Sequence, residues 1–331
     1  MGVRVTPNLD TLGTVFVATR PLKETYPDVV FNGQNYVMVW GDMNLDSVNF
    51  YMVTARVSPD GSVLDTPAVL STALGVSDAN NAKVAFDGNR CLAVWNTDAG
   101  SIGARFINSA GQPDGNMFWV LANGGSKPDI AFDGTNYLVV WNSAGYDIMG
   151  QRVSPQGQMV GSRVTIATGS QTQIFPSVTY DGLQYLVVWR QVETSSRLIC
   201  GQLVNTSGGL IGSNFTISDA SANEKWFAAA AASDQNYLVA WDENRGAATD
   251  IYGNVDVAIN AIEEQGPKTV PRARLPSVVH GSLDLYRNRV YRIYDSQGRL
   301  VESRGRMTPG VYFLQSNRAG AIETQKVLVV E

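Results

Sequence analysis

Acidic side chains follow each of five tryptophans in this sequence, and a pair of carboxylates is what a glycosidase uses to cleave a sugar bond. The candidates in these segments are Asp42, Asp98, Asp147, Glu193, Asp242 and Glu243. None of them has a recognisable catalytic partner in the sequence, and a perturbed pair shows itself only in a structure. We therefore interpret the set as a loose acidic ring on a solvated polar rim, and keep a glycosidase as an alternative.

Other kinds of catalysis lack their residues. A serine triad needs a histidine base, and a zinc site needs several His or Cys ligands. His280 is the only histidine, and Cys91 and Cys200 each lie within an apolar strand pattern that is typical of a buried cysteine. Dinucleotide and P-loop fingerprints do not occur. The sequence thus predicts no catalytic residue, no metal and no cofactor.

The charge pattern restricts the partners. The 331 residues carry a formal net charge of -5, without a basic stripe, so we expect no nucleic-acid partner. No apolar run reaches the roughly 18 residues of a membrane-spanning helix. The first twenty residues lack the basic start and apolar stretch of a signal peptide. If the protein is exported, we expect its leader to be missing from this sequence.

The tryptophans mark an internal repeat. Five segments share the same order of features. Each has an apolar run, a turn that in four of them holds Asx-Gly, a tyrosine that is Cys91 in the second segment, and a further apolar run that ends in tryptophan. They are VVFNGQNYVMVW, VAFDGNRCLAVW, IAFDGTNYLVVW, VTYDGLQYLVVW and AAASDQNYLVAW. The segments recur about 50 residues apart, the length of a four-stranded propeller blade. The sequence predicts an all-β fold, a β-propeller of five blades or a truncated part of a larger one.

Each repeat contains four predicted strands. The Asx-Gly turn joins the first two as a hairpin, because these residues readily take positive φ angles. A third strand follows the tryptophan loop in the segments TARVSPDG, ARFINSAG, GQRVSPQG and GQLVNTSG, and a fourth apolar stretch completes the unit. The second strand is apolar on both faces, so we expect it to be covered by neighbouring blades.

The tryptophans themselves allow two interpretations. Exposed aromatic rings could stack on sugars, whereas regular recurrence in an inner strand favours packing between blades. We assign this structural role to Trp40, Trp95, Trp141, Trp189 and Trp241. Trp226 departs from the pattern and falls in a loop on the predicted binding face. It is the aromatic candidate for ligand contact, with Arg190 and Arg245 as polar candidates.

Closure of the ring needs the N-terminus. The fifth repeat has no recognisable fourth strand, and GTVFVAT at 13–19 fits that position, so we expect it to pair beside 250–257 and close a five-bladed ring. GVRVTP at 2–7 matches a third strand and competes for the place of 250–257. Either residues 1–12 lie outside the ring, or the chain is part of a longer array, which is the interpretation we favour.

The repeats stop near residue 258. Residues 259–274 are rich in charge and proline and are predicted to form a linker between the propeller, residues 1–258, and a small antiparallel, immunoglobulin-like β-sandwich, residues 275–331. This tail resembles the C-terminal sorting domains of cargo of the type IX secretion system. The resemblance is carried by VYRIYDSQGRLV, TPGVYFLQ and QKVLVV, with Gly298, Gly310, Tyr312 and Lys326. The Asn-Pro that usually precedes a glycine in that family is replaced by Leu275-Pro276-Ser277.

The FDGTNYLVVW repeats of residues 2–258 are similar to those of large bacterial surface and secreted proteins. That resemblance implies an architecture and brings no catalytic motif. We expect a non-enzymatic extracellular or cell-surface binding or adhesion propeller, exported through its tail by the secretion machinery, with a carbohydrate or protein ligand on the loop face. The alternatives are a secreted carbohydrate-active enzyme, a structural fragment of a larger surface protein and, for the tail, an ordinary immunoglobulin-like accessory domain.

Overall fold

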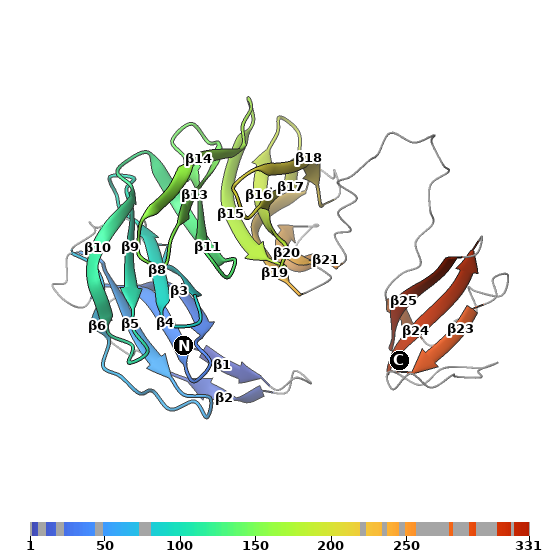
Figure 1. The fold of residues 1–331 in the computed structure, drawn as a ribbon, viewed down its shortest axis with the longest axis horizontal. Helices are drawn as coiled ribbons and strands as arrows, with labels where there is room; N and C mark the ends of the chain where they lie inside the picture. Colours follow the sequence, from blue (N-terminus) through green and yellow to red (C-terminus); the bar gives the residue numbers. More distant parts are fainter. Residues whose placement is uncertain are drawn as a thin grey trace. The chain divides into compact units, whose positions relative to one another are not determined.

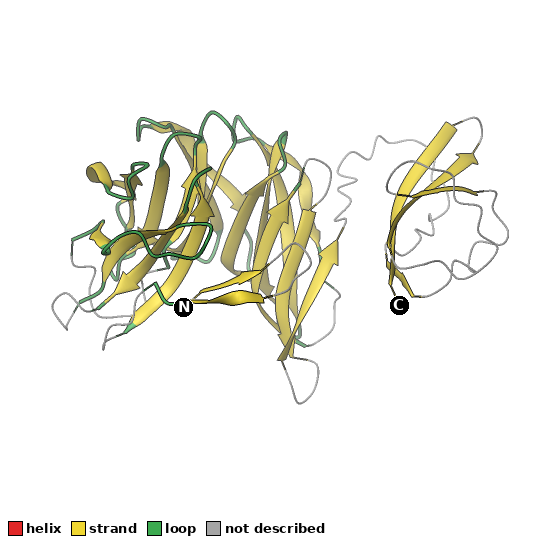
Figure 2. Cartoon of the chain, turned by 90° about the horizontal axis from the view of Figure 1, so that it is seen from below, coloured by secondary structure: helices red, strands yellow, loops and turns green. Residues whose placement is uncertain are grey.

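The structure is a computed structural model of the whole chain. It describes residues 2–5, 11–17, 23–43, 49–72, 81–218, 223–233, 237–244 and 249–255, and the backbone of four strands beyond them, at 278–280, 291–295, 310–318 and 321–330. The chain divides into two compact units, Met1–Glu263 and Glu264–Glu331. All regular elements of the described residues are strands, as the predicted all-β class requires (Figure 2).

The described strands of the first unit form a two-stranded sheet, β1 (Gly2–Val5) with β2 (Thr11–Val15), and five larger sheets, each built from three or four consecutive strands. The first of these five holds β3 (Glu24–Phe31), β4 (Tyr36–Asp42), β5 (Tyr51–Val57) and β6 (Ala68–Val69). The second holds β7 (Lys83–Phe86), β8 (Cys91–Asn96), β9 (Ile102–Ile107) and β10 (Pro113–Leu121). The third holds β11 (Gly125–Phe132), β12 (Tyr137–Ser143), β13 (Ile148–Val153) and β14 (Met159–Ala167). The fourth holds β15 (Thr172–Tyr180), β16 (Gln184–Val192), β17 (Arg197–Asn205) and β18 (Leu210–Thr216), and the fifth β19 (Glu224–Ala232), β20 (Tyr237–Asn244) and β21 (Thr249–Val255).

These sheets are the blades of the predicted propeller. Within each blade every strand pairs antiparallel with the next strand in sequence. The first strands of successive blades contact one another in the order β3, β7, β11, β15 and β19, so they form the inner wall (Figure 1). The predicted five-bladed arrangement is confirmed.

The Asx-Gly turns fold as expected from their side chains. In the third blade, Asp133 Oδ1 accepts hydrogen bonds from the backbone N–H groups of Thr135 at 2.7 Å and Asn136 at 2.6 Å. Gly134 between them has a φ of 90°, which a side chain would strain. The same bonds recur at the turns led by Asn32, Asp87 and Asp181. Short polar side chains therefore fix the register of these hairpins locally.

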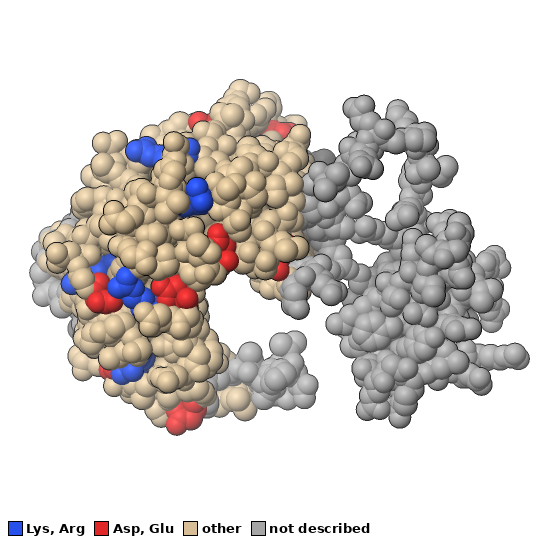
Figure 3. Space-filling model, in the orientation of Figure 1, with Lys and Arg blue, Asp and Glu red and all other residues tan. Residues whose placement is uncertain are grey.

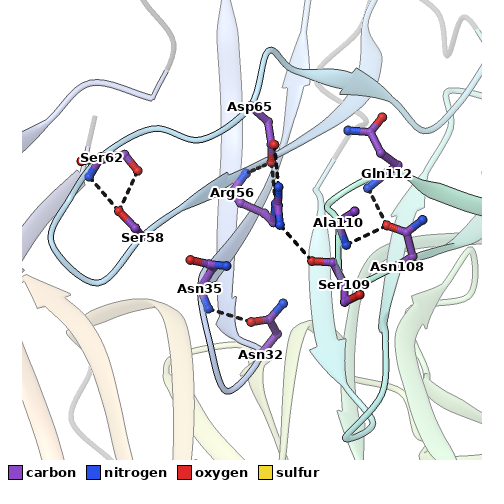
Figure 4. Close-up of polar contacts among 10 residues, drawn as sticks. All are labelled: Asn32, Asn35, Arg56, Ser58, Ser62, Asp65, Asn108, Ser109, Ala110 and Gln112. Carbon is purple, nitrogen blue, oxygen red and sulfur yellow. Dashed lines mark hydrogen bonds and ion pairs between the residues drawn. The ribbon is translucent and has the colours of Figure 1, made fainter.

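The turns between third and fourth strands also hold neighbouring blades together (Figure 4). Arg56 donates to both carboxylate oxygens of Asp65, at 2.8 Å and 2.9 Å, and to the carbonyl oxygen of Ser109 in the second blade at 3.1 Å. This hydrogen-bonded pairing lowers the pKa of Asp65 below its ordinary value. Arg152 repeats the contact between blades three and four by donating to the carbonyl oxygen of Thr206 at 3.1 Å.

The five recurring tryptophans lie in the core. Trp95, Trp141 and Trp189 are among the largest fully buried side chains, and Trp40 and Trp241 are also buried. Each of the later four packs in one cluster with the second-strand apolar residues of the preceding blade; for Trp141 these are Leu92 and Val94. The tryptophan of one blade thus fills the junction with the blade before it, and Trp40 packs with Val17 from the N-terminal segment.

The predicted closure is wrong for the described residues. Strand β2 (Thr11–Val15) pairs with β1 (Gly2–Val5) in a separate two-stranded sheet, and β21 pairs only with β20 among the described strands. The physical reason is chain entropy: a turn of five residues closes the β1–β2 hairpin, whereas pairing with β21 would close a loop of more than two hundred residues. In Figure 1 the hairpin lies beside the first blade, on the side away from the second.

The second unit shows one four-stranded sheet in the order β22 (Val278–His280), β25 (Ala321–Val330), β24 (Gly310–Arg318) and β23 (Tyr291–Asp295). Two of its three pairings are antiparallel, as predicted, but β22 runs parallel to β25. The parallel pair joins the first and last strands, whose long connection allows a crossover that a hairpin does not. The predicted linker, residues 259–274, lies outside the described residues.

Two further observations concern single features of the sequence. No helix in the described part of the chain has the length and apolar character to cross a membrane. Cys91 and Cys200 are buried free thiols, as predicted, and burial raises the pKa of Cys91 to about 12 and that of Cys200 to about 11.

We predict that Trp141→Ala lowers the free energy of unfolding by about 3–5 kcal/mol, because it empties the junction between blades two and three. Urea denaturation followed by circular dichroism measures this change. Trp119→Ala is the matched control, since Trp119 lies on β10 with 48% of its surface exposed and should cost less than about 1 kcal/mol. Equal losses from both substitutions would refute the packing role.

Candidate functional site

The inner strands of the propeller are interrupted at one equivalent place. The register shifts between Thr25 and Asp28 in β3, and at the corresponding positions of β11, β15 and β19. In β3, β11 and β15 one residue inside the bulge takes a left-handed angle, with φ of 49° at Tyr26, 54° at Lys127 and 56° at Phe175. Such angles strain a bulky side chain, and strain of this kind concentrates at functional sites.

The bulge residues gather into one cluster of aromatic and polar groups. We call Tyr26, Asn81, Lys127, Phe175 and Phe227 the bulge cluster; they occupy the same position in the five blades, Asn81 just ahead of β7. The rings of Phe175 and Phe227 lie 4.7 Å apart between centroids, and Phe227 is 60% exposed. Tyr26 is also exposed. Four blades thus present an aromatic or cationic side chain at this end of the inner wall.

Lys127 connects three of the other blades. Its ammonium nitrogen lies 5.3 Å from the ring centroid of Tyr26 and 5.8 Å from that of Phe175, and it donates to Asn81 Oδ1 at 3.3 Å. Its backbone N–H donates to Asn96 Oδ1 at 3.1 Å. The cluster therefore already places a cation over two aromatic faces, an arrangement with favourable electrostatics.

A second aromatic group extends the cluster across blades four and five. The guanidinium carbon of Arg190 lies 3.9 Å from the ring centroid of Trp226, which is 40% exposed. Arg190 also donates to Glu224 Oε2 at 3.0 Å, and Arg197 approaches the same oxygen at 3.5 Å. Burial is the main cause that lowers the pKa of Arg190. The structure thus brings together two of the predicted contact residues, Trp226 and Arg190.

Two residues further along three of the five inner strands, a polar side chain accepts a hydrogen bond from the backbone of the next blade. Asp28 Oδ2 accepts a hydrogen bond from the backbone N–H of Val84 at 2.9 Å, and Asp129 Oδ2 accepts one from Val178 at 2.9 Å. Ser177 Oγ accepts from the N–H of Ala230 at 3.3 Å. We call Asp28, Asp129 and Ser177 the clamp residues. A serine in the same role shows that the position needs an acceptor rather than a charge.

The equivalent residue of the second blade is Lys83, which completes a partly buried charge group. Its ammonium lies 3.9 Å from Asp28 Oδ1, and the charges of Asp129 and Asp28 raise its pKa against the opposing effect of burial. Burial also raises the pKa of Asp28, with a contribution from the charge of Asp129, while Lys83 acts in the opposite direction. Two carboxylates therefore share one ammonium beneath the bulge cluster.

The structure distributes the six predicted acidic residues over different roles. Asp42 and Glu243 are fully buried and are not part of a solvated rim. Glu243 lies 3.4 Å from the buried ammonium of Lys225 and accepts from the indole N–H of Trp241 at 3.0 Å. Asp242 accepts from the backbone N–H of Phe227 at 2.8 Å, so it holds a bulge.

The remaining predicted residues lie in turns or outside the described residues. Glu193 accepts hydrogen bonds from Gln191 at 3.0 Å and Ser196 at 3.2 Å. The backbone N–H of Asp147 donates to Ser143 Oγ at 3.1 Å, and Asp98 is exposed in a tight turn. Arg245 lies outside the described residues.

Sequence reasoning missed the bulge cluster and the clamp residues. A signal was present, because X-Pro-Asp or X-Pro-Ser occurs in three inner strands, as Tyr26-Pro27-Asp28, Lys127-Pro128-Asp129 and Phe175-Pro176-Ser177. Proline inside a strand marks a bulge or an edge. The acidic residues after the tryptophans share a place in the repeat but not the same surroundings, because Asp42 and Glu243 are buried whereas Asp98 is exposed in a turn.

The opposite end of the blades holds a shallow hollow of about 290 Å³, lined by Asp133, Thr135, Asn136, Tyr180 and Thr206. Its polar groups serve the turns: Asp133 caps the hairpin, and the carbonyl oxygen of Asn136 accepts from the hydroxyl of Tyr185 at 3.1 Å. On the face drawn in Figure 3, charged groups of both signs lie beside one another. The bulge cluster therefore remains the candidate site.

Comparison with known proteins returns structural neighbours only. No protein-family model matches the sequence, and no curated protein matches it. A thermostable family-43 glycoside hydrolase is 14% identical with a TM-score of 0.45, over 75% of this chain and 95% of its own. An endo-arabinase from Bacteroides thetaiotaomicron is 13% identical with a TM-score of 0.43, over 70% and 94%. A putative TolB from Agrobacterium tumefaciens is 17% identical with a TM-score of 0.46, over 72% and 78%. Likeness of this degree says nothing about a substrate.

We predict that Asp129→Ala lowers the free energy of unfolding by about 3 kcal/mol, because two backbone N–H groups lose a charged acceptor. Ser177→Ala should cost about 1 kcal/mol, since its single bond is neutral and longer. Chemical denaturation measures both. Asp250→Ala, at an exposed position of β21, is the control. A loss no larger at Asp129 than at Asp250 would show that the clamp does not hold the blades.

Proposed function

We propose that this protein is a non-enzymatic, extracellular carbohydrate-binding propeller whose site is the bulge cluster together with Trp226 and Arg190. The observation that carries the proposal is the exposure of three aromatic rings, those of Tyr26, Trp226 and Phe227, in the bulges at one end of the inner wall. Exposed Trp, Tyr and Phe rings offer flat apolar faces to the C–H groups of a sugar, and neighbouring Lys and Arg donate to its oxygens. The strained backbone angles of Tyr26, Lys127 and Phe175 support the proposal, because strain that does not improve core packing is typical of residues that contact a ligand.

The clamp residues argue against hydrolysis. Both oxygens of Asp129 accept backbone hydrogen bonds at 2.9 Å, from Ile130 and from Val178. One oxygen of Asp28 is engaged in the same way and the other faces Lys83. A general acid must give its proton to the leaving group and a nucleophile must reach the sugar carbon. Carboxylates that serve as acceptors between blades are poorly placed for either task.

One observation favours the alternative of a secreted glycosidase. The pKa of Asp28 is raised, as a general acid requires, and Asp129 lies close enough for its charge to contribute. In that mechanism Asp28 would protonate the leaving oxygen and Asp129 would act as base or nucleophile. Release of reducing ends from an oligosaccharide that the protein binds, abolished by Asp28→Asn, would establish the enzyme in place of the binding protein.

We predict that a glycan array finds oligosaccharide ligands for the isolated propeller, and that the double variant Trp226→Ala/Phe227→Ala weakens their binding about tenfold or more. The melting temperature should stay within a few degrees, because both side chains are exposed. Trp119→Ala is the control for an exposed aromatic on another strand. Unchanged affinity in the double variant would place the ligand elsewhere and refute the site.

We also propose that the second unit is a type IX sorting domain that brings the propeller to the cell surface, with the secretion machinery as its partner. The residues that support this lie on its last two strands: Gly310 begins β24, Tyr312 follows on it, and Lys326 lies on β25 opposite Phe313. Gly298 lies outside the described residues.

We predict that residues 275–331, placed behind a signal peptide and a fluorescent reporter, carry the reporter to the surface of a bacterium with type IX secretion. Protease accessibility on whole cells measures the outcome. Deletion of 321–331, which removes β25, should leave the reporter in the periplasm. Periplasmic retention of the intact fusion would refute the sorting role and would favour an ordinary accessory domain.

A further inference from the structure

The N-terminal hairpin has the geometry of half a blade. In β1–β2, Gly2 lies opposite Val15 and Val5 opposite Thr11. In the third blade, Gly150 lies opposite Val164 and Val153 opposite Met159, and in both places five residues separate the two strands along the chain. Strands β1 and β2 therefore correspond to the third and fourth strands of a blade. Among the described strands, β1 pairs only with β2, so the edge that a second strand would occupy is open.

The hairpin also packs like the outer half of a blade. Val17, just after β2, packs in a cluster with Trp40. Ile166, at the equivalent place in the third blade, packs with Trp189 of the fourth. The hairpin thus occupies the outer part of a blade position that precedes the first blade, and the inner two strands of that position are not among the described strands.

The fifth blade exposes the face that the other blades bury. Leu92, Leu138 and Leu186 are fully buried by the following blade, whereas Leu238 at the same position of β20 is 45% exposed. Ile102, Ile148 and Ile199 are likewise fully buried, whereas Ile251 of β21 is 77% exposed. An apolar sheet face of this kind marks an interaction surface.

We infer that this face and the open edge of β1 receive an antiparallel strand pair of the repeat's own type, contributed by a different protein that carries such repeats and not by a second copy of this chain. The argument is continuity: at four junctions the position equivalent to Leu238, held by a valine or a leucine, meets a strand pair whose second strand carries a tryptophan, and here a half-blade already holds the outer place. The second strand of the inserted pair would form backbone hydrogen bonds with β1, and its tryptophan would pack against Leu238. This mode of recognition is β-strand addition, in which the backbone bonds bind the strand and a side-chain pocket selects it.

The missing clamp at this junction suits an exchangeable partner. The clamp position of the fifth blade is Ala229, which has no side-chain acceptor for the backbone of a following strand. The other forward junctions of the described ring use Asp28, Asp129 or Ser177, except the one that follows Lys83. A docked strand pair would therefore be held only by apolar packing against the fifth blade and by backbone hydrogen bonds to β1.

The test measures protection of the exposed face in the full chain. Ile251→Cys supplies a thiol whose maleimide labelling rate reports exposure, while the two native cysteines are buried. A synthetic peptide of residues 124–143, the inner strand pair of the third blade, is the probe. We expect the peptide to slow the labelling of the introduced thiol in a saturable way. In a second variant, a copy of residues 124–149 replaces Met1, so that the copied strand pair has the same spacing to Gly2 as the original pair has to Gly150. We expect this fusion to slow labelling about tenfold.

Matched controls carry the changes Val139→Asp and Trp141→Ser in the peptide and in the fused copy, and should leave the labelling rate unchanged. Slowing by both the peptide and the fusion supports the inference. Slowing by the fusion alone would overturn the partner-chain source, and no slowing by either would overturn the docking site. Protection that rises with protein concentration without peptide, with dimers in sedimentation, would show that a second copy covers the face and would also overturn it.

Discussion

The propeller depends on one repeated contact, in which a tryptophan of the second strand inserts between its own blade and the one before. Trp95, Trp141, Trp189 and Trp241 each fill such a junction against aliphatic side chains of the preceding second strand. The junction is apolar and large, so the blades are held mainly by burial, which has no direction. Polar contacts orient the blades: the clamp residues act on the inner wall, and arginines of the third strands donate to turns of the next blade.

The different roles of these contacts indicate which part of the propeller surface can bind a ligand. The side chains in the middle of each blade pack in the core. The polar side chains of the turns at one end form hydrogen bonds within those turns, as Asp133 does. The bulges at the other end are different, because they hold Tyr26, Lys127 and Phe175 in strained angles and leave rings exposed. The fold therefore offers a ligand one surface whose side chains contribute little to the core.

The sequence predicted the elements that depend on neighbouring residues. The Asx-Gly hairpins and the buried tryptophans follow from turn chemistry and from a period that repeats. The position of residues 2–17 did not follow, although their resemblance to third and fourth strands was visible, because pairing partners far apart in the chain are set by entropy and packing. The candidate site was also missed, since a bulge is a property of two strands in register, and acidic residues such as Asp42 and Glu243 turned out to be buried.

The central claim is that the bulge cluster is a binding site and not a hydrolytic one. The most direct measurement is a crystal structure of the propeller soaked with the tightest oligosaccharide from the array. The account predicts an intact sugar stacked on Trp226 or Phe227, with Lys127 or Arg190 donating to its oxygens. Density at the hollow beside Asp133, or a cleaved sugar against Asp28 and Asp129, would contradict it.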